Sequence, residues 1–385
     1  MTSKRELELY FHIPFCRRKC LYCDFLSAPA DEETKARYME ALVRETSMRA
    51  GDYRDYRVVS VFVGGGTPST VDAGQLAKLF RAVSENYDIG EDAEITVEVN
   101  PGTADEDKLR IYREAGVNRL SIGLQSADDD ELARIGRIHT FARFLETYRD
   151  ARACGFTNIN VDLMSALPGQ TLDDYVRTLE AVLALEPQPE HISAYSLILE
   201  EGTALYEMNR EGILDLPDEE SDRLMYEKTA ELLGKAGYRR YEISNYAKRG
   251  FECVHNCGYW RRREYLGLGI GAASLIRDCR FKNGDSLEAY LSDPLGQQAE
   301  WQELTTEEQM EEFMFLGLRM TEGISLPEFQ NTFGKEMEDV YGTVIEKSRK
   351  AGLLKYYKGE KEEKRLALTG KGLDVCNTVM AQFLL

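Results

Sequence analysis

Three cysteines lie close together near the start of the chain, in the segment Phe15-Cys-Arg-Arg-Lys-Cys-Leu-Tyr-Cys-Asp24. The C-x3-C-x2-C spacing puts Cys16, Cys20 and Cys23 on one short loop, just after the apolar-alternating stretch 7–12. Three thiolates on such a loop hold three irons of a [4Fe-4S] cluster, whereas four thiolates would occupy every iron. The spacing therefore predicts a cluster whose fourth iron is open to a substrate or cofactor.

Zinc is the alternative that this loop leaves open. Structural zinc takes four ligands, usually as two separated pairs of cysteine or histidine, and no second pair follows near Cys23. We therefore favour the cluster. The scattered cysteines are expected to be buried apolar side chains: Cys154, Cys253, Cys279 and Cys376.

Polar residues and a glycine turn are spread over the following part of the chain. The turn Gly64-Gly-Gly-Thr67 lacks side chains, so its backbone can approach a ligand and offer N–H groups. A P-loop is excluded, because no Lys-Ser/Thr pair follows the glycines. Two carboxylates, an amide and a guanidinium come next in polar positions: Glu98, Asp162, Gln125 and Arg137. Taken singly, these are ordinarily solvated loop residues, and a triple glycine is ordinarily a tight turn.

The elements that would position these residues alternate between β-rich runs and amphipathic helical stretches. The runs lie near residues 7–12, 58–63, 94–99, 118–123, 157–162 and 190–197. In the helical stretch from Ala73 to Val83, Leu76, Leu79 and Phe80 fall on one face. This alternation predicts an α/β fold with a parallel sheet, either doubly wound or a partial barrel, because six units are too few for a closed eightfold barrel. In both, ligands bind beyond the carboxyl ends of the strands, where the polar residues fall.

After about residue 280 the pattern changes to helices. A capping-box-like signal at Thr305-Thr-Glu-Glu308 starts one, and two more are expected over 326–333 and 337–351. Residues 353–368 are expected to form a hairpin with Lys358-Gly359 at its turn. Three helices and a hairpin are similar to a winged helix. We expect domains at 1–285 and 286–385, the second serving as a lid or docking unit, since its first helix is rich in glutamate.

Composition excludes several classes of function. The 385 residues carry a net charge of −19, which argues against binding nucleic acid or an anionic membrane, since both need clusters of Lys and Arg. A hydrophobic content of 43% suffices for a real core. Three of the eight cysteines fall within eight residues, which is not the pattern of a disulfide framework, and no signal peptide or transmembrane segment is recognisable. We expect a cytoplasmic globular protein.

Six further segments follow the cysteine loop. They are Gly64-Gly-Gly-Thr-Pro-Ser69, Glu98-Val-Asn-Pro101, Ser121-Ile-Gly-Leu-Gln125, Gly136-Arg-Ile-His139, Asp162-Leu-Met-Ser-Ala-Leu-Pro-Gly-Gln170 and His255-Asn-Cys-Gly-Tyr-Trp260. With the cysteine loop, they resemble the radical S-adenosylmethionine (SAM) superfamily over nearly the whole chain. Within it they are similar to the branch of the oxygen-independent coproporphyrinogen III oxidase and the HemW-type haem chaperones. The resemblance implies a partial (β/α)6 barrel, a smaller winged-helix-like domain, and a [4Fe-4S] cluster that binds SAM.

The resemblance also assigns residues to these cofactors. Cys16, Cys20 and Cys23 match the cluster ligands. SAM presents an ammonium, a carboxylate, a sulfonium and ribose hydroxyls, which carboxylates and a guanidinium suit. The residues that match SAM contacts are Tyr10, Tyr22, Gly65, Gly66, Thr67, Glu98, Gln125, Arg137, Asp162 and Ser196. No catalytic residue is assigned, because reductive cleavage of SAM to methionine and a 5'-deoxyadenosyl radical needs no general base.

The segment around His255 contains a residue that the resemblance implies as a ligand of haem iron. It resembles the H-N-x-x-Y-W motif implicated in haem handling, and imidazole binds haem iron well, while a tryptophan can stack on the macrocycle. His255 is thus a candidate axial ligand of haem, with Cys257 as the alternative. A buried core histidine is the ordinary interpretation, and it is the default for His12, His139 and His191.

Departures from the family pattern bear on function. Coproporphyrinogen oxidases carry another cysteine two residues after the third, where this chain has Phe25. This difference favours the chaperone branch. Ala166 and Ala273 stand where the family typically has glycine and histidine, so we expect the substrate cavity to differ in detail.

Three functions remain in view. The first is a haem chaperone that binds haem as cargo and transfers it to an acceptor protein, with flavodoxin or ferredoxin as a possible reductant. The second is oxidative decarboxylation of the propionates of coproporphyrinogen III. The third is a zinc-stabilised regulator acting through the winged-helix-like region. We favour the first, because Phe25 and the His255 segment speak against the oxidase.

Overall fold

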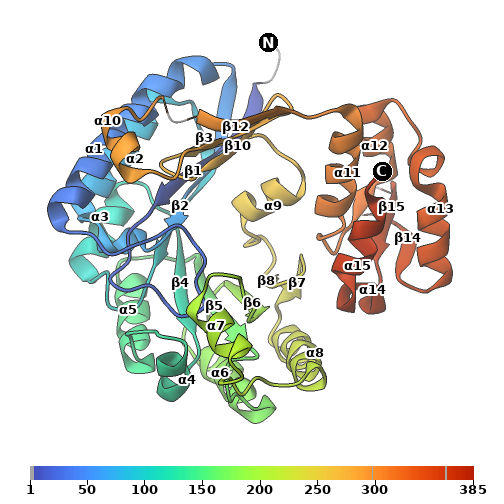
Figure 1. Cartoon of the computed structure of the whole chain (residues 1–385), viewed down its shortest axis with the longest axis horizontal. Helices are drawn as coiled ribbons and strands as arrows, with labels where there is room; N and C mark the ends of the chain where they lie inside the picture. The colour runs from blue at the N-terminus through green and yellow to red at the C-terminus, as the bar shows by residue number, and fades with distance from the viewer. Residues whose placement is uncertain (1–3, 297, 360–361) are drawn as a thin grey trace.

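The computed structural model of the chain describes residues 4–296, 298–359 and 362–385. Its centre is a twelve-stranded sheet in the order β12-β11-β10-β9-β1-β2-β3-β4-β5-β6-β8-β7. The six predicted strands are all present and parallel: β1 (Arg5–Ile13), β2 (Tyr56–Gly65), β3 (Ile89–Val99), β4 (Arg119–Gln125), β5 (Ile159–Ser165) and β6 (His191–Ser196). The sheet is open, since β12 and β7 end the order, and Figure 1 shows it curving around an interior. The partial barrel is confirmed.

Helices follow the parallel strands along the outer side of this curve (Figure 1). They are α1 (Glu32–Arg49), α2 (Ala73–Asn86), α3 (Glu106–Glu114), α4 (Asp129–Arg134), α5 (Phe141–Ala153) and α6 (Leu172–Leu183). Each begins at a polar residue whose side chain accepts a hydrogen bond from the first turn, namely Asp31, Asp72, Asp105, Asp128, Thr140 and Thr171. Single-turn 3-10 helices lie at Ala50–Tyr53 and Pro68–Thr70.

The core lies between the strands and these helices. Strand β4 is buried at every position, which is typical of a parallel strand covered on both faces. The predicted apolar face of α2 is buried, with Leu76 and Leu79 fully inaccessible to solvent. Burial of this kind stabilises by roughly 1.5–3 kcal/mol per large apolar side chain. The carboxyl ends of the strands are thereby held rigidly as a platform for a site.

Strands that the sequence did not predict extend the sheet at both ends. Beside β6 lie β7 (Arg239–Arg240) and β8 (Asn245–Ala247); beside β1 lie β9 (Tyr265–Leu268), β10 (Ala273–Ile276), β11 (Cys279–Asn283) and β12 (Gln298–Glu303). All six strands are short, and β12 is exposed along its whole length, so none of them has the sustained alternating burial that a sequence pattern would reveal. Strand β12 continues the large sheet to Glu303, which favours a domain division there rather than at 285/286. The expected change to helices after about residue 280 is confirmed only in part, because β11 continues to Asn283 and β12 follows the helix Leu287–Ser292.

Four further helices connect strands of the large sheet, and a C-terminal unit, residues 304–385, follows the last strand. Helices α7 (Ala204–Arg210) and α8 (Glu219–Lys235) lie between β6 and β7, α9 (Val254–Trp260) lies between β8 and β9, and α10 (Leu287–Ser292) lies between β11 and β12. The unit itself contains α11 (Thr306–Gly317), β13 (Ile324–Ser325), α12 (Leu326–Phe333), α13 (Met337–Lys350), β14 (Leu354–Lys358), β15 (Lys364–Leu368), α14 (Gly370–Asp374), α15 (Cys376–Met380) and a 3-10 turn, Ala381–Phe383. The capping box at Thr305 and the hairpin of β14 and β15 are as predicted.

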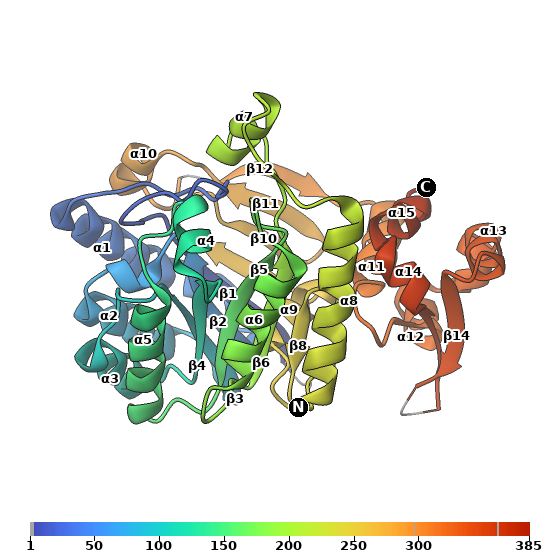
Figure 2. The same ribbon diagram turned by 90° about the horizontal axis from the view of Figure 1, so that it is seen from below.

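The C-terminal unit has a hydrophobic core of its own, centred on Phe329, Met337 and Leu366. Figure 2 shows the unit beside the barrel, with α11 toward it, and α5, α6 and α8 along the near side of the sheet. Among the helices of the described residues, none is long and apolar enough to cross a membrane.

Candidate functional site

A cavity of about 480 Å³ lies at the carboxyl ends of the parallel strands; we call it the main cavity. This volume is within the usual range for small-molecule sites, about 300–1,000 Å³. Twelve residues singled out in the sequence line it: Cys16, Cys20, Cys23, Tyr22, Gly65, Gly66, Thr67, Glu98, Gln125, Arg137, Asp162 and Ser196. Segments up to 180 residues apart in the chain thus meet at one place, as the βα pattern predicts.

Two further predicted residues lie next to the main cavity rather than in it. Tyr10 and His255 line an adjoining space of about 220 Å³, the inner cavity. It shares Glu98 and Asp162 with the main cavity, and Asn256 borders both. The His255 segment, although distant in sequence, is therefore adjacent to the predicted SAM site.

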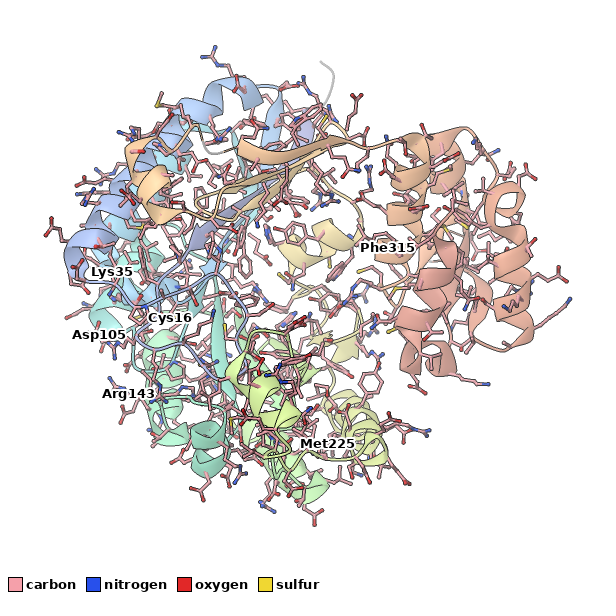
Figure 3. All side chains as sticks on the ribbon, in the orientation of Figure 1. Cys16, Lys35, Asp105, Arg143, Met225 and Phe315 are labelled. Carbon is pink, nitrogen blue, oxygen red and sulfur yellow. The ribbon has the colours of Figure 1, made fainter. Side chains whose placement is uncertain are left out.

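The cysteine loop is tied down at both ends and in the middle. Its start is bridged to its end, where the Cys16 N–H donates to the Ala28 carbonyl over 3.2 Å. The N–H of Leu21 donates to the Ile135 carbonyl over 3.0 Å, and the Leu21 carbonyl accepts from Leu205 over 2.9 Å. Figure 3 labels Cys16 on this loop. Backbone bonds to two distant segments fix the loop over the strand ends.

The glycine turn is needed because the cysteine loop passes against it. A Cβ added at Gly66 would lie 2.8 Å from the Phe15 carbonyl oxygen, and one at Gly65 would lie 2.5 Å from the His12 ring. Gly65 also has a φ of 106°, which residues with a side chain rarely adopt. Next along the chain, the Thr67 hydroxyl lies 3.3 Å from the Cys16 thiol. The structure thus shows a close approach between two segments of the chain, and the approach to a ligand that the sequence suggested stays a prediction.

The thiols suit a cluster better than a single ion. All three are free and partly exposed. Within the described residues, no group of three His, Cys, Asp or Glu side chains is placed to hold one metal ion. Thiolates that each bind a different iron need not converge on one point, whereas zinc ligands must lie about 2.0–2.3 Å from the same atom.

Two of the acidic side chains that line the main cavity have raised pKa values. Burial raises the pKa of Glu98 to about 8, assisted by the nearby Asp162 and opposed by the Gly65 N–H, which donates to Glu98 Oε2 over 3.2 Å. Burial also raises the pKa of Asp162, although Asn160 Nδ2 donates to it over 2.7 Å. A bound cation would offset the cost of ionising both groups.

Arg137 supplies a buried positive charge opposite them. Burial acts to lower its pKa, but nearby anionic partners outweigh this and raise it, so the guanidinium stays charged. Its Nη1 donates to Asn100 Oδ1 over 3.0 Å, while its buried Nε has no hydrogen-bond partner. Such an orphaned donor calls for an acceptor, which a ligand carboxylate provides.

Several lining residues were not assigned from the sequence. Asn100 holds Arg137, and the Tyr195 hydroxyl donates to Gln125 Oε1 over 2.9 Å. Asn100 lies within the quoted Glu98–Pro101 segment, and Tyr195 directly precedes Ser196 on β6, so position at a strand end was the available signal. Ser196 itself donates to Asp222 over 2.8 Å.

His255 is enclosed by hydrogen bonds and rings. Its Nδ1 lies 2.8 Å from the Ser60 hydroxyl, its Nε2 lies 3.0 Å from the Tyr259 hydroxyl, and its ring stacks on Phe62 with centroids 5.0 Å apart. Burial, with the charge of Arg119 added, lowers its pKa to about 3, so the imidazole is neutral. Cys257 is also buried, which raises the pKa of its thiol to about 12.

The other flagged residues fall into three groups. His12, His139 and His191 are buried and hydrogen-bonded, as their default interpretation predicts. Of the scattered cysteines only Cys253 is fully buried; Cys154, Cys279 and Cys376 are partly exposed, which corrects that expectation. Phe25 lines the main cavity with 60% of its surface exposed.

Comparison with known proteins identifies the family and the fold of the chain. Residues 10–182 match the family model for the radical SAM superfamily, and residues 304–375 match that for the HemN C-terminal domain. The solved structure of coproporphyrinogen III oxidase (HemN) from Escherichia coli covers 99% of this chain and 91% of its own, with a TM-score of 0.85. At 24% identity, that likeness shows the fold alone.

Curated relatives extend over the whole chain. The heme chaperone HemW of Lactococcus lactis is 36% identical over 98% of this chain and 97% of its own length. The heme chaperone HemW of Bacillus subtilis is 37% identical over 97% of this chain and 98% of its own length. The chain belongs to the radical SAM superfamily, in the family of these HemW proteins. Membership implies a [4Fe-4S] cluster and SAM as cofactors.

Proposed function

We propose that the protein binds haem and delivers it to an acceptor protein, with a [4Fe-4S] cluster and SAM held in the main cavity. The observation that carries this proposal is the similarity to HemW chaperones over essentially the full length of both chains. The oxidase is the weaker candidate, because Phe25 stands where oxidases have a further cysteine and the similarity to the solved HemN structure reports only fold.

The site residues take the following proposed roles. Cys16, Cys20 and Cys23 would bind three irons of the cluster, which would leave the fourth iron open to SAM. When bound, the cluster supplies one electron for reductive cleavage of the SAM sulfonium. The Arg137 guanidinium, with its unpartnered Nε, holds the SAM carboxylate, while Glu98 and Asp162 face the ammonium or the ribose hydroxyls.

The remaining assigned residues shape and seal the site. Gly65, Gly66 and Thr67 let backbone approach the cofactor, and Gln125 is held in place by Tyr195. Tyr22 lies within the cysteine loop and limits the access of water, while Ser196 sits at the end of β6. Tyr10 acts from the inner cavity, as a wall rather than as a direct partner.

His255 keeps its proposed role as axial ligand of haem, with a condition that the geometry adds. Both ring nitrogens are engaged in the free protein, so one hydroxyl must turn away before iron can bind. The buried Cys257, with its raised pKa, is a poorer ligand because only the thiolate binds iron well.

The proposal also covers partners and compartment. The C-terminal unit is the proposed lid or docking surface for the haem acceptor, and flavodoxin or ferredoxin the proposed reductant. The cytoplasm is the proposed compartment, which suits eight free thiols.

Anaerobic reconstitution with iron and sulfide, followed by haem titration and transfer to an apo-haemoprotein, tests the function. Cys16→Ser, Cys20→Ser and Cys23→Ser should each abolish the cluster, whereas Cys154→Ser and Cys376→Ser should leave the iron content unchanged. Formation of decarboxylated product from coproporphyrinogen III, without haem binding, would instead establish the oxidase.

A separate pair of variants tests His255. His255→Ala should shift the Soret band of bound haem. Tyr259→Phe keeps the ring but frees Nε2, so it should bind haem at least as tightly as the wild-type protein. An unchanged Soret band in His255→Ala would assign the iron to another ligand.

A further inference from the structure

A third cavity of about 420 Å³ lies on the other side of the inner cavity, and we call it the side cavity. It is formed between β1, β9 and β10 on one side and helices α9 and α11 on the other. In Figure 1, α9 lies inside the curve of the sheet, between these strands and α11. Nothing in the roles proposed so far uses this space.

Five of the eleven residues that line the side cavity carry aromatic rings. Tyr10 and His12 come from β1, Tyr259 and Trp260 from α9, and Tyr265 from β9. The rings of Tyr259 and Tyr265 meet edge to face, with centroids 4.6 Å apart. Aromatic walls favour a flat, largely apolar ligand, because ring faces bury much area at well-defined stacking distances.

Two guanidiniums stand among these rings. Arg262 donates from Nε to Glu312 and from Nη1 to Asp278, over 2.8 and 2.9 Å. Arg280 donates to the Tyr265 hydroxyl and to Glu312, over 2.9 and 2.6 Å. The Arg280 side chain is about a third exposed, so it can reach a further anion without being drawn out of the core. Arginine is well suited to pairing with carboxylates.

The hydrogen bonding of this wall is incomplete. Arg262 Nη2 and Trp260 Nε1 are both buried and both lack a partner. Buried donors are nearly always satisfied, because a buried donor without a hydrogen-bond partner destabilises the folded state. One face of the Trp260 ring is covered by the Arg319 guanidinium at 4.2 Å, which fixes the indole in place. A ligand carboxylate, after a small movement of these side chains, would satisfy both donors.

We infer that the side cavity is the haem-binding site, with the macrocycle between the aromatic walls and its propionates toward Arg280 and Arg262. The inference rests on the proposed function, since it names where the cargo lies. The site is separate from the SAM site, because Tyr10 and Tyr259 form a wall shared with the inner cavity, which borders the main cavity. His255 lies on the inner side of this wall, so it reaches the haem iron only after Tyr259, whose hydroxyl contacts its Nε2, has moved aside. Leu316 of α11 closes the site from the C-terminal unit.

Filling the cavity tests its location. Ala273, an exposed residue of β10, and Leu316 line it from opposite sides. In the reconstituted holoprotein, Ala273→Trp and Leu316→Trp should each weaken haem binding at least about tenfold, measured at the Soret band. SAM affinity, measured by calorimetry, should stay within about twofold. Ala299→Trp, at an exposed position of β12 outside the cavity, should change neither affinity.

Removing the anion partner tests the orientation. Arg280→Gln should lower affinity for haem several-fold but leave affinity for haem dimethyl ester, which lacks carboxylates, unchanged. Arg277→Gln serves as the control, because Arg277 lies on the same hairpin but pairs with Asp55 outside the cavity.

The outcomes separate the site from the function. If the wild-type protein binds haem and both filling variants bind it equally well, the side cavity is not the site, although the chaperone function stands. If the wild-type protein binds no haem, the proposed function fails and the inference with it. Loss of haem binding in both filling variants, with cluster and SAM retained, supports the assignment.

Discussion

Glu98 illustrates how one buried side chain couples the site to pH. With a pKa of about 8, raised chiefly by burial, it is mostly protonated at neutral pH in the free protein. A raised carboxyl pKa means that the folded protein holds this proton more tightly than the unfolded chain. The contribution of Glu98 to the free energy of unfolding therefore falls as the pH rises between about 4.5 and 8.

SAM binding should depend on pH in the opposite direction, growing stronger as the pH rises. The ionised form pairs with a cation, so binding releases the proton, and SAM affinity should rise between about pH 6 and pH 7.5 by up to about tenfold per unit. Calorimetry on the reconstituted protein measures this. Glu98→Gln should remove the slope, and an equal slope in that variant would rule out Glu98 as its source.

Ala166 gives a second prediction at this scale. It has a φ of 56°, in the left-handed region where a Cβ is strained, and the family typically has glycine there. Ala166→Gly should therefore raise the free energy of unfolding by about 0.5–1 kcal/mol, measured by urea denaturation. Ala133→Gly, in the exposed part of helix α4, should instead lower it by about 1 kcal/mol.

At the level of elements, the cysteine loop depends on the turn after β2. In Gly66→Ala the new Cβ would meet backbone atoms of Ile13 and Phe15, which cannot move without shifting the loop. We expect reduced cluster occupancy, measured as iron per protein after reconstitution. Gly342→Ala, in helix α13 with open space around it, should keep full occupancy and gain about 0.5–1 kcal/mol of stability.

The same elements show what the sequence could predict. The parallel strands and α2 carry strong periodic patterns, so their positions were predicted, although β3 begins at Ile89 rather than near residue 94 and α2 continues to Asn86. The strand-end rule brought the polar residues together. Strands β9 to β12 are short or exposed and carry no such pattern. Partners such as Asn100 and Tyr195 act by holding other side chains, and that role becomes visible only when distant segments are in contact.

The placement of His255 shows the other limit. Its motif indicated a ligand, but its two hydrogen bonds and its stack on Phe62 depend on residues about 195 positions away in the chain. The sequence offered no sign that both ring nitrogens of His255 form hydrogen bonds. Nor could the sequence show that Asn256, in the same motif, lines the main cavity.

At the scale of the whole molecule, Glu312 joins the C-terminal unit to the sheet. Its carboxylate is 11% exposed and accepts hydrogen bonds from Arg262 and Arg280. Glu312→Gln leaves two guanidiniums short of their anion. We expect a loss of roughly 2 kcal/mol or more, less than the about 3–5 kcal/mol of a fully buried pair because Arg280 is partly exposed.

The measurement is chemical unfolding of the cluster-free protein. Glu346→Gln is the matched control, since Glu346 pairs with Lys350 at the surface and should cost less than about 1 kcal/mol. Equal effects of the two substitutions would show that Glu312 contributes no more than a surface pair.

The exposed strand β12 has a consequence for how copies of the protein meet. An open sheet ends in unpaired N–H and C=O groups, which can template edge-to-edge association. Along β12 the register with β11 shifts between Arg280 and Lys282, and Glu300 takes a left-handed φ of 52°. A bulged edge that carries Glu300 and Glu303 cannot present a flat row of partners to a second strand. The irregularity thus protects against aggregation a sheet that the fold leaves open.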